Sequence, residues 1–309
     1  MDWITNFLAA AVIAGTPLLF GTLGEIIIEK VGNLNLGVEG LMLLGSVMGF
    51  MVGLSTGNPF IALIAAMIAG ALGALVYAFL TVTLRANQTV SGLALTIFGT
   101  GLSSLLGTKL VGQVTPDSIK VFFKPVAIPL LSKIPVLGTA LFNQDPFIYL
   151  GYICAIVLGL YLYKTSKGLN VIAVGENPAA ADAASININL YKYVHILLGG
   201  ALCGLGGAYL SLVYVPAWQE NVTAGRGWIA VALVIFVGWN PFKALIGAYF
   251  FGGLDILGFR ISSPFINQYL IAAIPYIATF VVLVVVSMRN SRKNSPPKSL
   301  GQSYFREER

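Results

Sequence analysis

Charged residues are scarce in this 309-residue chain: Asp, Glu, Lys and Arg together make up 10%, against about 25% in an average soluble domain. Hydrophobic residues make up 57%, and the mean hydropathy is +0.85. A soluble protein of this composition would lack the polar surface that keeps it in water. The composition therefore excludes an ordinary soluble domain and predicts a chain whose solvent is mainly lipid.

Several chemical signatures are also missing. The chain has only two cysteines, Cys154 and Cys203, both in apolar runs, and one histidine, His195, so neither a disulfide framework nor a zinc-type spacing is available. No G-x-x-x-x-G-K-[ST] phosphate loop and no nucleophile–base pair occurs. We expect no catalytic residue, no metal site and no cofactor bound by this chain. The net charge of +6 does not indicate a nucleic-acid partner, because the basic residues fall in loops and in the tail.

Nine apolar segments could cross a membrane as helices, since a crossing of about 30 Å takes about 20 residues. We expect an all-α integral membrane protein with about nine transmembrane helices, eight or ten being the alternatives. Residues 1–288 would form the transmembrane domain and residues 289–309 a basic, mobile tail. No Lys or Arg precedes Lys30, so we expect the first helix to be retained rather than cleaved as a signal peptide. The segments are 3–23, 38–54, 60–84, 89–106, 147–163, 193–214, 228–239, 244–259 and 269–288.

The distribution of basic residues predicts the orientation in the membrane. With the tail inside and nine crossings, twelve of the Lys and Arg residues lie on the inner side and six on the outer side. This excess agrees with the positive-inside rule. We therefore expect a cytoplasmic C-terminus in the cytoplasmic membrane. Four lysines between residues 109 and 133 fall on the outer side, in a long segment of the kind that obeys the rule poorly.

Two polar stretches interrupt the apolar sequence at the starts of predicted helices. In residues 32–40, glycines and asparagines precede Glu39, and such backbone is tolerated at membrane depth only where it is buried in protein or lines a cavity. Residues 85–92 bring amides and hydroxyls that can both donate and accept hydrogen bonds, as an uncharged polar solute requires. For both stretches, capping of a helix start is the alternative. With two tryptophans near the expected outer mouth, the candidate pathway residues are Asn35, Glu39, Asn87, Gln88, Thr89, Ser91, Trp218 and Trp228.

A third stretch, residues 174–187, lies in the loop expected on the cytoplasmic side. Asn177 suits an N-cap and Pro178 the first helical turn. The alanines that follow would give a short helix with a smooth surface, which suits a groove on another protein better than it suits water. The candidate docking residues are Gly175, Glu176, Asn177, Pro178, Ala180, Ala183 and Ala184.

Together these stretches resemble a known family. Residues 31–43, 85–92, 128–147 and 175–187 are similar to segments of ABC transporter permeases of the branched-chain amino acid, ribose and simple-sugar class, and most similar to its nucleoside and simple-sugar branch. The resemblance implies one of two permease subunits, a separate ATPase that carries ATP and Mg and docks on 175–187, and an extracellular solute-binding lipoprotein. It implies import of a nucleoside or a simple sugar by alternating access. Ser185 departs from the family pattern, in which Gly is common at this position. Because serine adopts a left-handed conformation less readily than glycine, the sequence does not fix the residue at which the docking helix ends.

Two other hypotheses for the function are an ion-coupled secondary transporter and a membrane-embedded enzyme or scaffold. An ion-coupled secondary transporter would keep ionisable residues at mid-membrane, whereas Glu39, His195 and Asp255 fall near predicted helix ends. A membrane-embedded enzyme or scaffold would need a reactive constellation that the sequence does not contain. An ion pair between Asp255 and Arg260 would account for those two charges, and hydrogen bonding within the bundle would account for His195.

Overall fold

The computed structural model describes residues 2–260, 273–288 and 295–305. It is almost entirely helical. Six of its helices are long and apolar enough to cross a membrane: residues 3–30, 38–56, 59–83, 88–110, 146–164 and 188–214. The protein is therefore a multi-pass membrane protein. The total of nine crossings stays a prediction, because the later helices are shorter or border residues outside the described ranges.

The first half of the chain builds α1 (Asp2–Lys30), α2 (Val38–Thr56), α3 (Pro59–Ala78) and α4 (Gln88–Gly107). The π-helical turn η1 (Phe79–Thr83) extends α3, and the 3₁₀ turn η2 (Thr108–Leu110) extends α4. Short elements follow up to residue 144. They are α5 (Asp117–Phe122), β1 (Val126–Ala127), η3 (Leu131–Lys133), α6 (Leu137–Phe142) and β2 (Asn143–Gln144), with β1 and β2 paired antiparallel.

The second half contains α7 (Pro146–Lys164), α8 (Ser166–Glu176), α9 (Pro178–Ala183) and α10 (Ile188–Tyr209), which the π turn η4 (Leu210–Tyr214) extends. After a loop come α11 (Arg226–Phe236), α12 (Pro241–Arg260) and α14 (Ile274–Met288). The predicted segment 228–239 thus corresponds to an 11-residue helix. The start of the predicted segment 269–288 lies outside the described residues.

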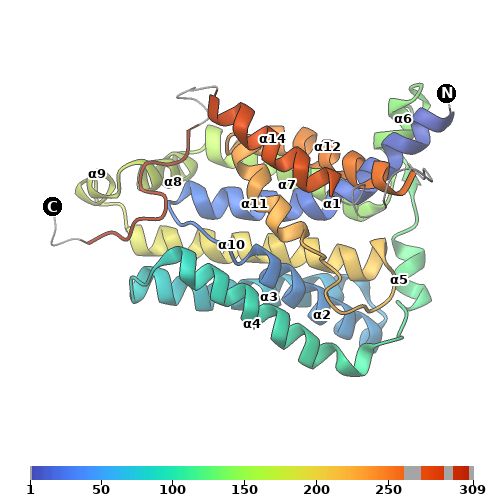
Figure 1. Cartoon of the computed structure of the whole chain (residues 1–309), viewed down its shortest axis with the longest axis horizontal. Helices are drawn as coiled ribbons and strands as arrows, with labels where there is room; N and C mark the ends of the chain where they lie inside the picture. The colour runs from blue at the N-terminus through green and yellow to red at the C-terminus, as the bar shows by residue number, and fades with distance from the viewer. Residues whose placement is uncertain (1, 261–272, 289–294, 306–309) are drawn as a thin grey trace.

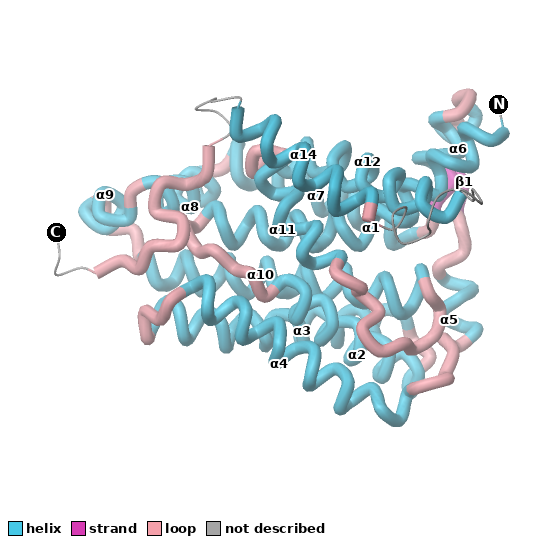
Figure 2. The backbone as a smooth tube through the Cα atoms, viewed as in Figure 1, coloured by secondary structure: helices cyan, strands magenta, loops and turns pink. Residues whose placement is uncertain are grey.

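The long helices run roughly side by side, and the short elements gather at the two ends of the bundle (Figure 1). One end holds α8, α9 and the C-terminal residues, and the other holds the N-terminus, α5 and α6. Figure 2 shows the connecting loops concentrated at these same ends. The two termini therefore lie at opposite ends of the bundle.

Helix α10 lies at the centre and packs against α1, α2 and α3. Glycines let these backbones meet: a Cβ on Gly207 would lie 1.8 Å from the Met42 carbonyl oxygen, and one on Gly45 would lie 2.2 Å from the Gly204 carbonyl oxygen. In lipid such close packing replaces the missing hydrophobic drive between helices. Close packing does not explain every glycine in a helix, since a Cβ on Gly101 would meet nothing within 4 Å.

Helix α1 is longer than the sequence predicted, and the connection after it is buried. The apolar run Ile26–Ile28 continues the helix past residue 23 to Lys30. Residues 31–37 then run back among the helices before α2 begins (Figure 1), and Asn33 and Asn35 are fully buried there. Within the described chain, this is the clearest case of non-helical backbone enclosed by helices, as the glycines and asparagines predicted.

A candidate docking helix and a buried polar network

The predicted docking helix is present as α9. The Asn177 side chain caps it by accepting a hydrogen bond from the Ala180 N–H at 3.0 Å, and Pro178 occupies the first turn. Both features follow from local preferences that the sequence already displays. The helix projects at the end of the bundle, beside α8 (Figure 1).

The end of α9 is also defined. The Ile186 N–H donates to the Ala181 carbonyl at 3.0 Å and the Ser185 N–H donates to the Asp182 carbonyl at 2.9 Å, which is the Schellman arrangement. It requires a left-handed residue, and Ser185 supplies it with φ of 62°. Serine at this left-handed position therefore leaves the helix end in place, at the cost of unfavourable backbone sterics of about 1 kcal/mol.

The predicted docking residues divide by exposure. Ala180, Ala183 and Ala184 are exposed, so the smooth outer face of α9 is open to a partner. Gly175 is buried instead: a Cβ there would lie 2.3 Å from the Lys30 carbonyl oxygen, so this glycine serves the contact between α8 and α1. Glu176 and Pro178 are half-buried, and Asn177 is exposed.

The C-terminal residues 295–305, which we expected in a mobile tail, lie against the helical body. Both the N–H and the hydroxyl of Ser299 donate to the Gly175 carbonyl, at 3.0 and 2.6 Å. The Tyr304 hydroxyl donates to Asp182 Oδ2 at 2.9 Å. We expected mobility because the segment is polar. Its partners on α8 and α9 are more than 100 residues away in the sequence, so no local pattern identifies them. Residues 289–294 and 306–309 lie outside the described residues.

The pathway candidates Asn35 and Gln88 both take part in holding the buried connection 31–37. The Asn35 N–H donates to Glu25 Oε1 at 3.0 Å, and its side-chain oxygen accepts from the Gly37 N–H at 2.8 Å. Gln88 Oε1 accepts from the Leu34 N–H at 2.7 Å. The Tyr77 hydroxyl donates to the Leu34 carbonyl at 2.6 Å. These amides therefore satisfy backbone groups of an otherwise unsupported segment.

Two acidic residues of this network were missed by the sequence interpretation. Glu25 and Glu29 are 0% and 2% exposed on α1, one turn apart, and the Trp239 indole N–H donates to Glu29. Among the described residues Glu25 Oε2 has no hydrogen-bond partner. The run Glu-Ile-Ile-Ile-Glu at residues 25–29 could have indicated that both carboxylates lie on a membrane helix, because apolar residues continue beyond the first one. The predicted helix ended at residue 23 and therefore did not include them. Trp239 itself is 3% exposed and lies inside the protein.

Glu39 joins the starts of two helices. It is 5% exposed at the start of α2. Its carboxylate accepts from the Thr223 hydroxyl at 2.5 Å, from the Gly225 N–H at 2.8 Å and from the Gly227 N–H at 2.6 Å. A carboxylate at a helix N-terminus is favoured by the helix dipole and the free N–H groups there. The sequence predicted this effect for α2, whereas the donors come from the N-terminus of α11.

The remaining pathway candidates are dispersed. Asn87 is exposed and caps α4 by accepting from the Val90 N–H at 3.0 Å. Thr89 is half-buried and Ser91 is buried. Trp218 is buried with its ring centroid 6.0 Å from that of Phe50, and Trp228 is 40% exposed. Contact of these residues with a solute stays a prediction.

Two smaller expectations meet different outcomes. Asp255 forms an ion pair with Arg226, at 2.9 Å, and the side chain of Arg260, the expected partner, lies outside the described ones, so that pair stays a prediction. His195 is held as expected: its Nδ1 lies 2.6 Å from the Tyr191 carbonyl and its Nε2 lies 2.8 Å from the Tyr161 hydroxyl. Since a carbonyl only accepts, Nδ1 carries a proton, and in the neutral imidazole Nε2 accepts from the Tyr161 hydroxyl.

Comparison with known proteins decides the family. Residues 7–287 match the family described as the branched-chain amino acid transport system / permease component. The chain belongs to this permease family. The resemblance inferred from residues 31–43 and 175–187 is thereby confirmed.

Curated relatives resemble this permease over nearly its whole length. It is 37% identical to TsgC13 of Haloferax volcanii, whose name assigns it provisionally to glucose transport, over 99% of both chains. It is 33% identical to the guanosine ABC transporter permease NupQ of Bacillus subtilis, over 97% of this chain and 96% of that one. It is 32% identical to the nucleoside ABC transporter permease NupC of Lactococcus lactis, over 96% of both.

Proposed function

We propose that this permease is the membrane subunit of an ATP-driven importer for nucleosides. Family membership over residues 7–287 carries the proposal. Two of the relatives that match nearly the whole chain are named for guanosine and nucleosides. The chain itself would hydrolyse nothing, and ATP with Mg would be bound by a separate ATPase subunit.

A simple sugar is the second candidate solute. The observation that favours it is the 37% identity to a relative named for glucose. Nucleosides and sugars share hydroxyl groups, so the same amide and hydroxyl side chains could serve either one. What separates the two classes is the base, which an aromatic ring can stack on, and Trp228 is the exposed candidate for that contact.

The exposed face of α9 is the proposed docking site for the ATPase. Ala180, Ala183 and Ala184 present a surface without long side chains, and Asn177 and Ser185 fix the two ends of the helix. A rigid, smooth projection can seat in a groove with little loss of side-chain entropy. A second permease subunit and an extracellular solute-binding lipoprotein complete the proposed assembly, consistent with a family defined as one component of a transport system.

Uptake competition tests the solute. Radiolabelled uridine would be offered to cells with and without the gene, in the presence of excess guanosine, ribose or glucose. We expect uptake to fall on deletion and only the nucleoside to compete. Equal competition by ribose or glucose would replace the nucleoside with a simple sugar. Uptake that persists when ATP is depleted but collapses with a protonophore would contradict an ATP-driven importer.

A further inference from the structure

The C-terminal residues 295–305 connect two regions that lie far apart in the sequence. On one side they are bonded to α8 and α9 through Ser299 and Tyr304, as described above. On the other side they reach the start of α4: the Gln302 carbonyl accepts from Gln88 Nε2 at 3.3 Å, and the Ser303 hydroxyl donates to the Arg85 carbonyl at 3.4 Å. The Arg85 guanidinium also lies 4.7 Å from the centre of the Phe305 ring.

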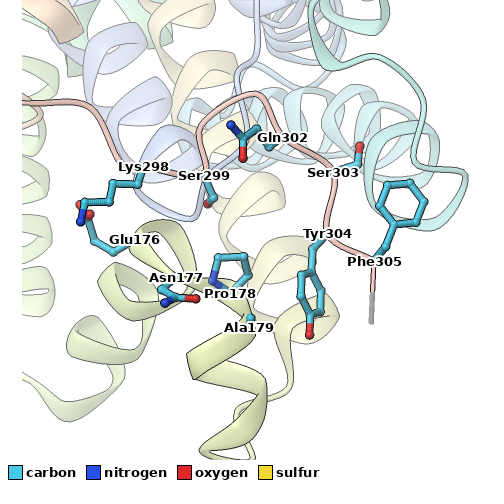
Figure 3. Close-up of a pocket in the computed structure, with 10 residues that line it drawn as sticks. All are labelled: Glu176, Asn177, Pro178, Ala179, Lys298, Ser299, Gln302, Ser303, Tyr304 and Phe305. Carbon is cyan, nitrogen blue, oxygen red and sulfur yellow. The ribbon is translucent and has the colours of Figure 1, made fainter. Parts of the chain in front are cut away.

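Figure 3 shows this segment passing over the start of α9, with Tyr304 directed toward the helix and Gln302 on the opposite side. An open cavity of about 360 Å³ lies between this segment and the helices α8 and α9. It is lined by residues 176–179 of the helices and by residues 298–299 and 302–305 of the segment. Pro297 and Ser299 are buried in this contact. The segment is therefore packed against the body and leaves a gap beside α9.

Helix α9 needs such support. It has six residues, and an isolated helix shorter than about 12 residues is marginal in water. Only Ala181 among its residues is fully buried, so little packing holds the helix in position. The bond from Tyr304 to Asp182 fixes its last turn from outside.

Gln88 continues the connection into the bundle. Its amide nitrogen donates to the tail at Gln302, and its amide oxygen accepts from the Leu34 N–H of the buried connection 31–37. One side chain, 2% exposed, therefore joins the tail to backbone that lies among the membrane helices. A shift of α9 that moved Tyr304 would be transmitted to Gln88 through the three residues 302–304.

We propose that residues 295–305 form a strap that positions α9 and links it to the connection 31–37, with Tyr304 and Gln88 as positioning residues for transport. This inference rests on the proposed function, in which α9 is where the ATPase docks. The strap would make ATP-driven movement of α9 and rearrangement of the buried connection a single event. Without it, the ATPase would still dock and hydrolyse ATP, and fewer solute molecules would cross for each ATP.

The test uses the complete transporter in proteoliposomes, with ATP hydrolysis and radiolabelled uridine uptake measured on the same preparation. Tyr304→Phe removes one hydroxyl and keeps the ring. We expect the ATP hydrolysed per uridine imported to rise by about threefold to tenfold, the range of one modest hydrogen bond. The amount of ATPase subunit that co-purifies should stay unchanged. Gln302→Ala is the matched control, because the exposed side chain of Gln302 is removed while its carbonyl remains.

Two further variants separate positioning from simple stability. Gln88→Glu keeps an oxygen for the Leu34 N–H and loses the donor to Gln302, so it should raise the same ratio. Asp182→Ala should raise it too, and adding Tyr304→Phe to Asp182→Ala should cause no further rise, since the tyrosine hydroxyl has then already lost its acceptor.

The possible outcomes separate the two proposals. An unchanged ratio in Tyr304→Phe, or a loss of assembled transporter with an unchanged ratio, would overturn the strap. Absence of uridine and sugar uptake by the wild-type complex would instead overturn the proposed function.

Discussion

At the residue scale, Glu39 shows how one buried charge is accommodated in this protein. Three donors from the start of α11 surround its carboxylate at 2.5–2.8 Å. A buried charge without such partners is expensive, whereas hydrogen bonds to a charged group each contribute about 1.5–3 kcal/mol. Glu39 therefore fixes the start of α11 against the start of α2, and that contact leaves little of the carboxylate free to bind a solute in this conformation.

Glu39→Gln should destabilise the protein by about 2–3 kcal/mol, because an amide nitrogen would face one of the backbone N–H groups that the carboxylate now accepts from. Thermal unfolding of the detergent-solubilised protein should show a midpoint lower by roughly 5 °C. Glu220→Gln is the control: Glu220 is exposed in the loop before α11, and its replacement should change stability by less than about 0.5 kcal/mol. Equal midpoints for the two variants would show that the bonds of Glu39 contribute nothing.

At the element scale, close approach of α2 and α10 depends on glycine at the contact. Gly207→Ala would place a methyl group 1.8 Å from the Met42 carbonyl oxygen, which only a backbone shift can relieve. Overpacking of this kind costs about 1–3 kcal/mol or more. Gly101→Ala, on α4 with open space around it, should instead be neutral or stabilising by up to about 1 kcal/mol. Yields of folded protein after detergent extraction compare the two, and similar yields would contradict the packing role.

Helix α9 allows a matched comparison on neighbouring alanines. Ala180→Glu with Ala183→Glu changes two exposed positions, so the protein should insert and fold normally while transport falls by more than about tenfold, as an interface with a buried charge predicts. Ala181→Glu changes the buried position, 3% exposed, and should lower the amount of folded protein. Normal uptake by the first variant would remove α9 from the docking surface.

At the scale of the whole molecule, the two ends of the bundle should face opposite sides of the membrane. Lys133 is exposed near α6, and Ala183 is exposed on α9, at the other end (Figure 1). In a background of Cys154→Ala and Cys203→Ala, we expect Lys133→Cys to react with an impermeant maleimide in intact cells. Ala183→Cys should react only in inverted vesicles, prepared from cells without the ATPase subunit so that the proposed docking face is uncovered. The opposite pattern would reverse the orientation that the positive-inside rule predicts.

The candidate site was only partly predictable from the sequence. Contacts between residues close together in the chain could be predicted, whereas contacts between distant residues could not. Asn177 and Pro178 were recognised because a cap and its helix are adjacent in the chain. The burial of the connection 31–37 was also predictable, because its glycines and asparagines follow one another within an apolar sequence. The partner of Glu39 is 184 residues away and that of Glu29 is 210 residues away, so no local pattern identifies either one.

Composition and local sequence were enough to predict that lipid is the solvent, where the six long membrane helices lie and where α9 begins, because hydrophobic burial and capping depend on composition and on near neighbours. The family was also readable from short segments of the chain. Only the tertiary structure decided which charges pair, that Glu25 and Glu29 are buried, and that residues 295–305 lie against α8 and α9. Those outcomes depend on which helix faces meet, and in a bundle with close-packed glycines that is set by the fit of whole helices to one another.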